Sequence, residues 1–300
     1  MPAILEYKVT EKDENRAIGH ILRKEFNMSA TVLKKLKDTG RIFLNGNLCK
    51  TIDIAKKDDI ISADVSENIS GNSFIQPFKG ELEIIYEDDF LIAVNKPGQM
   101  ETHPCPSNRT STLANIIMYF WQQKGEYHNY HIVNRLDKDT SGICIIAKNA
   151  FSHGVLSAQQ KNGDFKKEYI AVVHGEMESK EGEITKPIGR SDKSIIKREV
   201  RSDGKFSKTL FKTVETINNF SIIKVTTETG RTHQIRVHFS HIGHPLVGDW
   251  LYGCGDKERH LIKRHALHAE RIEFYHPQTK EKLIFTTNLP DDIKKLINSI

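Results

Sequence analysis

The strongest constraint on the fold is a succession of short apolar strand patterns after residue 81, with no regular alternation of strand and helix. The predicted strands cover residues 82–86, 90–94, 142–147, 167–173, 220–227 and 282–287. A helix is predicted at 112–122, and an Asp-Asp pair at 88–89 forms the turn between the first two strands. Because parallel strands need a long crossover, usually a helix, this order predicts an α+β domain with a mixed, largely antiparallel sheet.

The first 65 residues have a different pattern, which predicts a small α/β unit. Apolar side chains recur at helical spacing over 15–24, and a second helix is predicted from Ser29, a good N-cap, to Gly40. Residues 41–44 then form a short predicted strand, and the Asn-Gly pair that follows is a strong hairpin turn signal.

These patterns divide the chain into a domain at 1–65, a linker at 66–80 and a larger domain at 81–300. The 300 residues are 38% hydrophobic and 28% charged, which is typical of a soluble globular protein. No apolar run approaches the roughly 20 residues of a membrane helix, and no signal-peptide pattern is visible, so no membrane association is expected. The four cysteines form no CxxC pair, which predicts a cytoplasmic protein without disulfides or a thiolate zinc site.

Positive charge is concentrated in two places, although the net charge of +5 is modest. Segment 186–212 holds nine basic and three acidic residues, and we expect a loop or hairpin that projects from the sheet. The candidates for contact with a nucleic-acid backbone are Lys197, Arg198 and Arg201 in this segment, and Lys34, Lys35 and Arg41 in the first domain. On spacing alone, either group can equally be an ordinary solvated surface.

Segment 134–142 carries the side chains best suited to chemistry. It lies between two apolar runs, so a strand, a polar turn and a second strand are predicted there. Asp139 and the Thr-Ser-Gly that follows are the natural turn formers, which leaves Asp137 free to act in a site, with Arg135 two residues before it. Taken alone, Asp137 can also be a simple turn cap.

The same segment strongly resembles the Arg-Leu-Asp-x-x-Thr-Ser-Gly signature of the RluA family of pseudouridine synthases. Other motifs of that family occur in the same order, namely Asn95 to Gly98 with His103-Pro104, Lys167 to Ala171, Gly230 to His238, Gly243 to Asp249, Tyr252-Gly253, Leu267 to Ala269 and His276-Pro277. The resemblance covers residues 81 to about 290 and implies the pseudouridine synthase fold. Residues 1–65 are similar to an S4 RNA-binding domain.

The resemblance implies an isomerase that converts uridine to pseudouridine in structured RNA. Asp137 would be the essential carboxylate, acting at C1′ as nucleophile or at the ribose 2′ proton as base. Tyr169 would stack on the target uracil and assist proton removal from C5, although the pattern alone also allows a core tyrosine. Arg236 would pair with Asp137 and keep it ionised. Arg135 would fill the gap that the flipped base leaves in the RNA stack, and Ile235 would form an apolar wall.

Such a reaction rearranges bonds within one nucleotide, so no cofactor and no metal are implied. The histidines at 238–244 and 265–268 are interpreted as hydrogen-bonding residues rather than metal ligands. One position departs from the family, because Asn134 stands where a histidine is usual. Asn134 is still expected in the substrate-binding set; its amide can hold the turn, but it cannot carry charge, which weakens a contact with RNA phosphate.

Large-subunit ribosomal RNA is the expected substrate of a monomeric enzyme, since S4-bearing relatives often act on that RNA. Transfer RNA is the alternative within the class. A rival of another class is a non-catalytic RNA-binding or ribosome-assembly factor, for which Asn134 is the only support in the sequence. A glycoside hydrolase that uses paired acids is a third interpretation, and it would release free uracil or free sugar.

Overall fold

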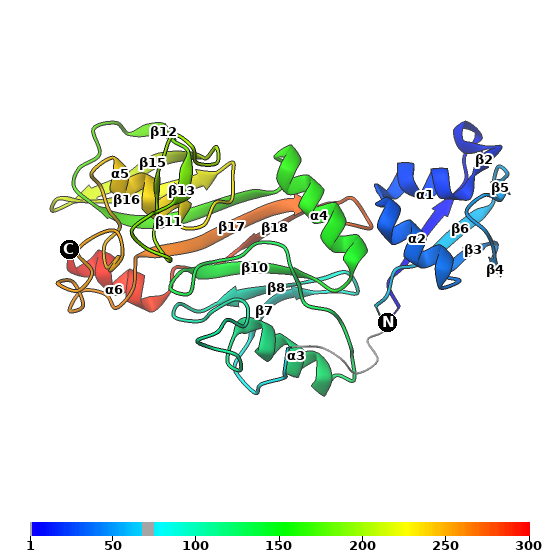
Figure 1. Ribbon diagram of the computed structural model, residues 1–300, viewed down its shortest axis with the longest axis horizontal. Coiled ribbons are helices and arrows are strands. Elements are labelled where there is room, and N and C mark those ends of the chain that lie inside the picture. The colour runs from blue at the N-terminus through cyan, green and yellow to red at the C-terminus, as the bar shows by residue number, and fades with distance from the viewer. Residues whose placement is uncertain (1, 68–74) are drawn as a thin grey trace.

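The structure is a computed structural model that describes residues 2–67 and 75–300 (Figure 1). A small N-terminal unit lies at one end of an elongated molecule, and a larger domain built on one long sheet makes up the rest. Most of the predicted linker, residues 68–74, lies outside the described residues.

The N-terminal unit is a four-stranded antiparallel sheet with two helices packed on it. The strand order is β1 (Ile4–Lys8), β6 (Ile60–Asp64), β3 (Ile42–Leu44) and β4 (Asn47–Leu48). The remaining elements are η1 (Glu11–Asp13), a short pair of β2 (Arg16–Ala17) with β5 (Ile54–Ala55), and the helices α1 (Ile18–Phe26) and α2 (Ala30–Asp38).

Local sequence signals explain most of these boundaries. The Ser29 hydroxyl accepts the Val32 N–H at 3.3 Å and so caps α2, as predicted. Asn45 and Gly46 have φ values of 50° and 79°, which suit the tight turn between β3 and β4. The prediction for α1 began three residues too early, because Arg16 and its neighbour pair with β5 before the helix starts.

The larger domain contains a ten-stranded sheet. Its central order is β12-β15-β16-β11-β17-β10-β8-β7, with β18 beside β17 and β9 beside β10. The strands are β7 (Glu83–Glu87), β8 (Leu91–Lys96), β9 (His131–Ile132), β10 (Ser141–Ala147), β11 (Lys166–His174), β12 (Glu181–Thr185), β15 (Lys208–Ile217), β16 (Phe220–Thr227), β17 (Leu267–Tyr275) and β18 (Lys282–Thr286). Only the β10–β17 pair is parallel among the paired strands of the described residues, so the predicted mixed, largely antiparallel sheet is confirmed.

Helices cover both faces of this sheet, and alternate residues of its strands point to opposite sides. The helices are α3 (Leu113–Gln123), α4 (Ala150–Asn162), α5 (Gln234–His241) and α6 (Asp291–Ser299). On one face, Trp121 of α3 and Phe239 of α5 pack in the same apolar core as Tyr169 of β11. On the other face, Leu156 of α4 packs against Phe274. The functional residues of β11 therefore lie on the α3–α5 face.

Within segment 186–212, residues 188–200 form a small hairpin outside the main sheet, while residues 208–212 belong to β15 of that sheet. Strands β13 (Ile188–Arg190) and β14 (Arg198–Val200) pair with each other, as the predicted hairpin requires, and Ile188 also forms an isolated bridge with Lys205. Separately, no helix among residues 2–67 and 75–300 has the length and apolar content to span a bilayer.

The N-terminal unit contacts the larger domain through hydrogen bonds and an ion pair of Glu67. This carboxylate accepts hydrogen bonds from Asn129 at 2.6 Å and from His131 at 2.9 Å, and it pairs with Lys35 of α2 at 3.2 Å. Phe151 of α4 also packs into the apolar core of the N-terminal unit. The two parts therefore share both a polar and an apolar contact.

Candidate active site

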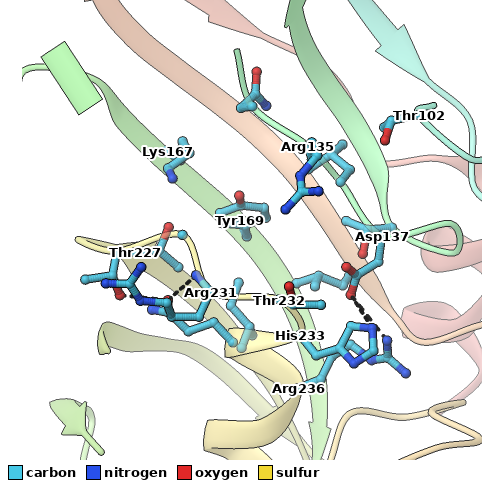
Figure 2. Close-up of a pocket in the computed structure, with 18 of the residues that line it drawn as sticks. Thr102, Arg135, Asp137, Lys167, Tyr169, Thr227, Arg231, Thr232, His233 and Arg236 are labelled. Atoms are coloured by element: carbon cyan, nitrogen blue, oxygen red, sulfur yellow. Dashed lines mark hydrogen bonds and ion pairs between the residues drawn. The ribbon is translucent and has the colours of Figure 1, made fainter. Parts of the chain in front are cut away.

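A cavity of about 560 Å³ opens on the α3–α5 face of the sheet (Figure 2). Three segments far apart in the sequence line it: the turn between β9 and β10, strand β11, and the loop that leads from β16 into α5. Asp137, Tyr169 and Arg236 all line this cavity, together with Arg135 and Ile235. The structure thus brings the three predicted catalytic residues together in one place.

The turn that carries Asp137 is held rigidly from behind. The Thr140 hydroxyl lies 2.8 Å from His265 Nε2, and the Ser141 hydroxyl lies 2.9 Å from His268 Nδ1. The buried guanidinium of Arg264 donates to the Asp139 carbonyl at 2.8 Å. Fixed neighbours of this kind preorganise a functional side chain at low entropic cost.

The glycine of the Thr-Ser-Gly motif has a specific structural cause. Gly142 has a φ of +114°, and a Cβ at this position would lie 2.3 Å from the carbonyl oxygen of Ala269. Any other residue would push β10 away from β17 exactly where these strands make their parallel contact. Gly142 thereby sets the distance between the Asp137 turn and the strands behind it.

Asn134 takes a structural role in place of the predicted substrate contact. Its buried amide donates to the Ile143 carbonyl at 2.9 Å and accepts the Ile145 N–H at 2.8 Å. These two bonds tie the start of the turn to β10. The side chain is therefore occupied by backbone groups and is not turned outward toward RNA.

Arg236 is anchored by a residue to which the sequence analysis assigned no role. Its guanidinium donates two hydrogen bonds to the fully buried Asp249, at 2.7 and 2.8 Å, and a third to Asp137 at 3.2 Å. Burial alone would lower the pKa of Arg236, but the bonds and charges of Asp249 and Asp137 outweigh it and raise that pKa. Arg236 thus stays charged and presents one N–H to the Asp137 carboxylate. The one sequence signal for this role of Asp249 is that it is an isolated acid at the end of the Gly243–Asp249 motif.

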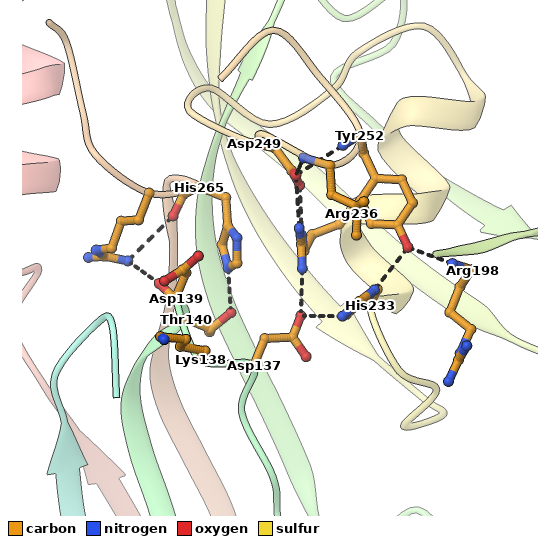
Figure 3. Close-up of polar contacts among 12 residues, drawn as sticks. Asp137, Lys138, Asp139, Thr140, Arg198, His233, Arg236, Asp249, Tyr252 and His265 are labelled. Carbon is orange, nitrogen blue, oxygen red and sulfur yellow. Dashed lines mark hydrogen bonds and ion pairs between the residues drawn. The ribbon is translucent and has the colours of Figure 1, made fainter. Parts of the chain in front are cut away.

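A second polar chain reaches Asp137 through His233 (Figure 3). His233 Nε2 lies 3.9 Å from Asp137 Oδ2, and Nδ1 lies 2.9 Å from the hydroxyl oxygen of Tyr252. That hydroxyl accepts the backbone N–H of Arg198, the first residue of β14, at 2.8 Å. Burial lowers the pKa of His233, although the Asp137 charge opposes this. Hydrogen bonds therefore connect the basic hairpin to His233, whose Nε2 faces the Asp137 carboxylate from beyond hydrogen-bond distance.

Tyr169 forms a wall of the cavity near Asp137. Its ring is buried, with 8% of its surface exposed, and it shares an apolar core with Ile235 and Leu136. Burial raises the pKa of Tyr169 well above its usual value, and the Asp137 charge adds to the shift. The phenol therefore stays protonated near neutral pH, which suits stacking better than action as a phenolate base.

The other predicted RNA-contact residues have different surroundings. Arg201 is held inside the hairpin by Asp192 at 2.6 Å and Asp203 at 2.8 Å, so it fixes the hairpin rather than offering a free cation. Lys35 is paired with Glu67, and Arg41 donates to the Ser66 carbonyl. The remaining predicted contacts keep their side chains at least partly exposed: Lys34, Arg135, Lys197 and Arg198.

The histidines have hydrogen-bonding roles. His238 lies 2.9 Å from the Thr209 hydroxyl and 3.0 Å from the Lys186 carbonyl, while His265 and His268 support the Asp137 turn. In the described part of the chain, no group of three or more His, Cys, Asp or Glu side chains is placed to hold a metal ion.

Several known proteins are similar to this chain over most of its length. The family model described as RNA pseudouridylate synthase matches residues 90–241, which include the Asp137 turn, β11 and α5. An RNA pseudouridine synthase of Bacillus subtilis, YhcT, is 36% identical over 97% of this chain and 96% of its own. Ribosomal large subunit pseudouridine synthase D of Buchnera aphidicola is 34% identical over 91% of this chain and 90% of its own.

Solved structures show the same fold. The human RNA pseudouridylate synthase domain containing 1 protein has a TM-score of 0.57 and 24% identity, over 77% of this chain and 97% of that one. The related human domain containing 4 protein has a TM-score of 0.59 and 18% identity, over 72% of this chain and 92% of that one. The predicted resemblance is thereby confirmed: this chain belongs to the RNA pseudouridylate synthase family, whose enzymes isomerise uridine to pseudouridine in RNA.

Proposed function

We propose that the protein isomerises specific uridines in large-subunit ribosomal RNA, with Asp137 as the essential carboxylate. One observation carries the proposal: Asp137 lies in a cavity with Tyr169, and Arg236 holds it at 3.2 Å while Asp249 anchors Arg236 from behind. The relatives named ribosomal large subunit pseudouridine synthase D support the choice of RNA, at 34% to 39% identity.

The chemistry needs a carboxylate beside the sugar and a flat surface beside the base. The bond from C1′ to N1 breaks, the uracil turns, a bond from C1′ to C5 forms, and the C5 proton is lost while N1 gains one. Asp137 acts at C1′ as nucleophile or at the ribose 2′ proton as base. Arg236 keeps the carboxylate oriented toward the sugar through either step.

The cavity also suits a base that has left the RNA stack. Flipping a nucleotide out of a duplex costs about a few kcal/mol, and stacking on an aromatic ring returns roughly 1–3 kcal/mol. Tyr169 supplies that ring, and Ile235 and Leu136 supply apolar contact. Arg135, which is exposed and lines the cavity, would fill the gap left in the stack.

Outside the cavity, the N-terminal unit and the β13–β14 hairpin are the proposed RNA-binding surfaces. We assign the S4-like role to residues 2–65, with Lys34 on the exposed side of α2, and we assign phosphate contacts in the hairpin to Lys197 and Arg198. A cytoplasmic monomer remains our proposal, and the free state of all four cysteines, each within the described residues, supports a reducing compartment.

A tritium-release assay tests the proposed reaction. Wild-type protein is incubated with large-subunit ribosomal RNA transcripts labelled at uridine C5, and transfer RNA serves as the comparison substrate. Isomerisation predicts tritium release that is abolished in Asp137→Asn, a variant of nearly the same shape. No release from either protein would favour the non-catalytic RNA-binding factor, and free uracil among the products would favour a glycoside hydrolase.

A further inference from the structure

Lys167 is a cation inside the cavity that the proposed mechanism does not use. It lies on β11 two residues before Tyr169, so both side chains project from the same face of the strand. Within the described residues its side chain makes no hydrogen bond and has no acidic partner, whereas the side chain of its neighbour Lys166 pairs with Glu273 at 3.8 Å. Burial lowers the pKa of Lys167, and no nearby carboxylate opposes that shift. An ammonium in such a position is stabilised when a ligand brings negative charge.

The loop between β16 and α5 leaves open space next to this ammonium. A Cβ built on Gly230 would lie 3.6 Å from Lys167 Nζ, so the side-chain-free backbone of Gly230 faces the lysine. The next residue, Arg231, is exposed and lines the cavity, and its Nε donates to the Phe206 carbonyl at 3.0 Å. That bond fixes the guanidinium and leaves its terminal N–H groups for a ligand.

Charge is divided between the two ends of the cavity. Asp137 is the only acid among the described lining residues, and Arg236 and His233 already face it. In Figure 2, Tyr169 lies between Asp137 and Lys167, so the cationic end is separated from the carboxylate by the ring on which uracil would stack. Arg231 lies toward the Lys167 end in the same view.

We propose that Lys167, Gly230 and Arg231 form a subsite for one phosphodiester group of the RNA, on a linkage beside the target uridine. A phosphodiester is the anion that every RNA substrate brings to this cavity. A lysine beside a bare glycine backbone allows its close approach, and an arginine fork can bind two of its oxygens. The subsite rests on the proposed function, and it would fix the sugar relative to Asp137 while the base is detached.

A double-mutant cycle between protein and RNA tests the subsite. A set of short RNA substrates carries one neutral methylphosphonate each, at successive linkages around the target uridine. We expect one of these linkages to lower kcat/KM of the wild-type enzyme by about ten- to a hundredfold, the range for a charge-assisted hydrogen bond. With Lys167→Met, that same methylphosphonate should cause a clearly smaller loss than in the wild type, because one of the two cationic partners of the phosphate is already gone.

Two further variants sharpen the result. Lys166→Met removes the adjacent, exposed lysine of the same strand and should keep the full wild-type sensitivity to methylphosphonate. Gly230→Ala fills the space next to Lys167 and should reproduce the loss of sensitivity, and thermal melting checks that both cavity variants fold.

Strictly additive losses for Lys167→Met at every linkage would overturn the subsite while leaving the isomerase intact. An inactive wild-type enzyme on unmodified RNA would instead contradict the proposed function itself. The two failures are therefore distinguishable in one experiment.

Discussion

His233 Nδ1 lies 2.9 Å from the hydroxyl oxygen of Tyr252, and this contact joins the basic hairpin to a histidine that faces the Asp137 carboxylate. The Tyr252 hydroxyl accepts the Arg198 N–H, so its own proton is directed to His233 Nδ1. The proton of the neutral imidazole is then on Nε2, which lies 3.9 Å from Asp137. Burial raises the pKa of Tyr252 to about 12, so the hydroxyl keeps its proton at neutral pH. We therefore expect the Tyr252 hydroxyl to hold the His233 ring in its position beside Asp137.

Tyr252→Phe should therefore lower the rate of the chemical step without weakening RNA binding. The variant loses one hydroxyl and leaves the ring, which also lies 5.0 Å from the Arg236 guanidinium. We expect the single-turnover rate to fall about tenfold, which corresponds to the roughly 1.4 kcal/mol of one buried hydrogen bond, while RNA affinity stays unchanged. Tyr275→Phe, an exposed tyrosine of β17, is the matched control. An equal rate in both variants would show that the chain does not position Asp137.

Asp137 is also supported by Arg236, which Asp249 holds in place, and this pair can be tested by mutation. Asp249→Ala would leave the buried Arg236 guanidinium without its main partner and would remove the acceptor of the Leu251 and Tyr252 N–H groups. Breaking a buried ion pair from one side costs about 3–5 kcal/mol, so we expect a large loss of unfolding free energy in urea together with a loss of activity. Asp256→Ala, which removes an exposed pair with Arg259, should change neither quantity measurably.

The sequence predicted the fold and the site to different depths. In the larger domain, periodicity located six strands and α3 within a few residues, because those strands have a buried face and that helix an apolar side. It did not predict the strands β12 and β15 or the helices α4, α5 and α6. The Asp-Asp turn and the Asn-Gly turn were correct because their chemistry is local. The parallel contact of β10 with β17 joins segments more than 120 residues apart, and no local pattern encodes it.

Within the site, the resemblance named the residues, but their partners could not be predicted. Arg201 looked like a free cation because its pairing with Asp192 and Asp203 depends on how the hairpin folds back. Lys167 was named only as the first residue of a predicted strand and of a family motif, since the lack of an acidic partner for its side chain becomes visible only when its surroundings are known. The sequence shows which side chains are available for a site, but the contacts that these side chains make depend on the tertiary structure.

Asn134 was predicted as a substrate contact, but its side chain binds backbone groups of β10, and mutation can test which role it has. Asn134→Ala would leave the buried Ile143 carbonyl and the Ile145 N–H without partners, at a cost of about 1–3 kcal/mol in unfolding free energy. We expect RNA affinity, measured well below the melting temperature, to remain that of the wild type. A selective loss of RNA binding with unchanged stability would restore the substrate contact that the sequence suggested.

Glu67 makes the attachment of the N-terminal unit depend on pH. Burial alone would raise the pKa of Glu67, but hydrogen bonds from His131 and Asn129, with the charges of His131 and Lys35, outweigh it and hold the pKa at about 2. The folded pKa is thus below the unfolded value, so the stabilisation is complete above pH 4.5 and is lost as the pH falls from there toward 2. The shift corresponds to about 3 kcal/mol at neutral pH.

Glu67→Gln removes this linkage, and urea unfolding at a series of pH values measures it. The difference in unfolding free energy between wild type and Glu67→Gln should be largest at pH 7 and should shrink steadily below pH 4.5. Glu11→Gln is the control, because the side chain of Glu11 is 77% exposed and its pair with Lys57 is on the surface. A difference that stays constant from pH 7 to pH 3 would mean that the Glu67 carboxylate contributes by shape alone, and that its charge does not hold the N-terminal unit in place.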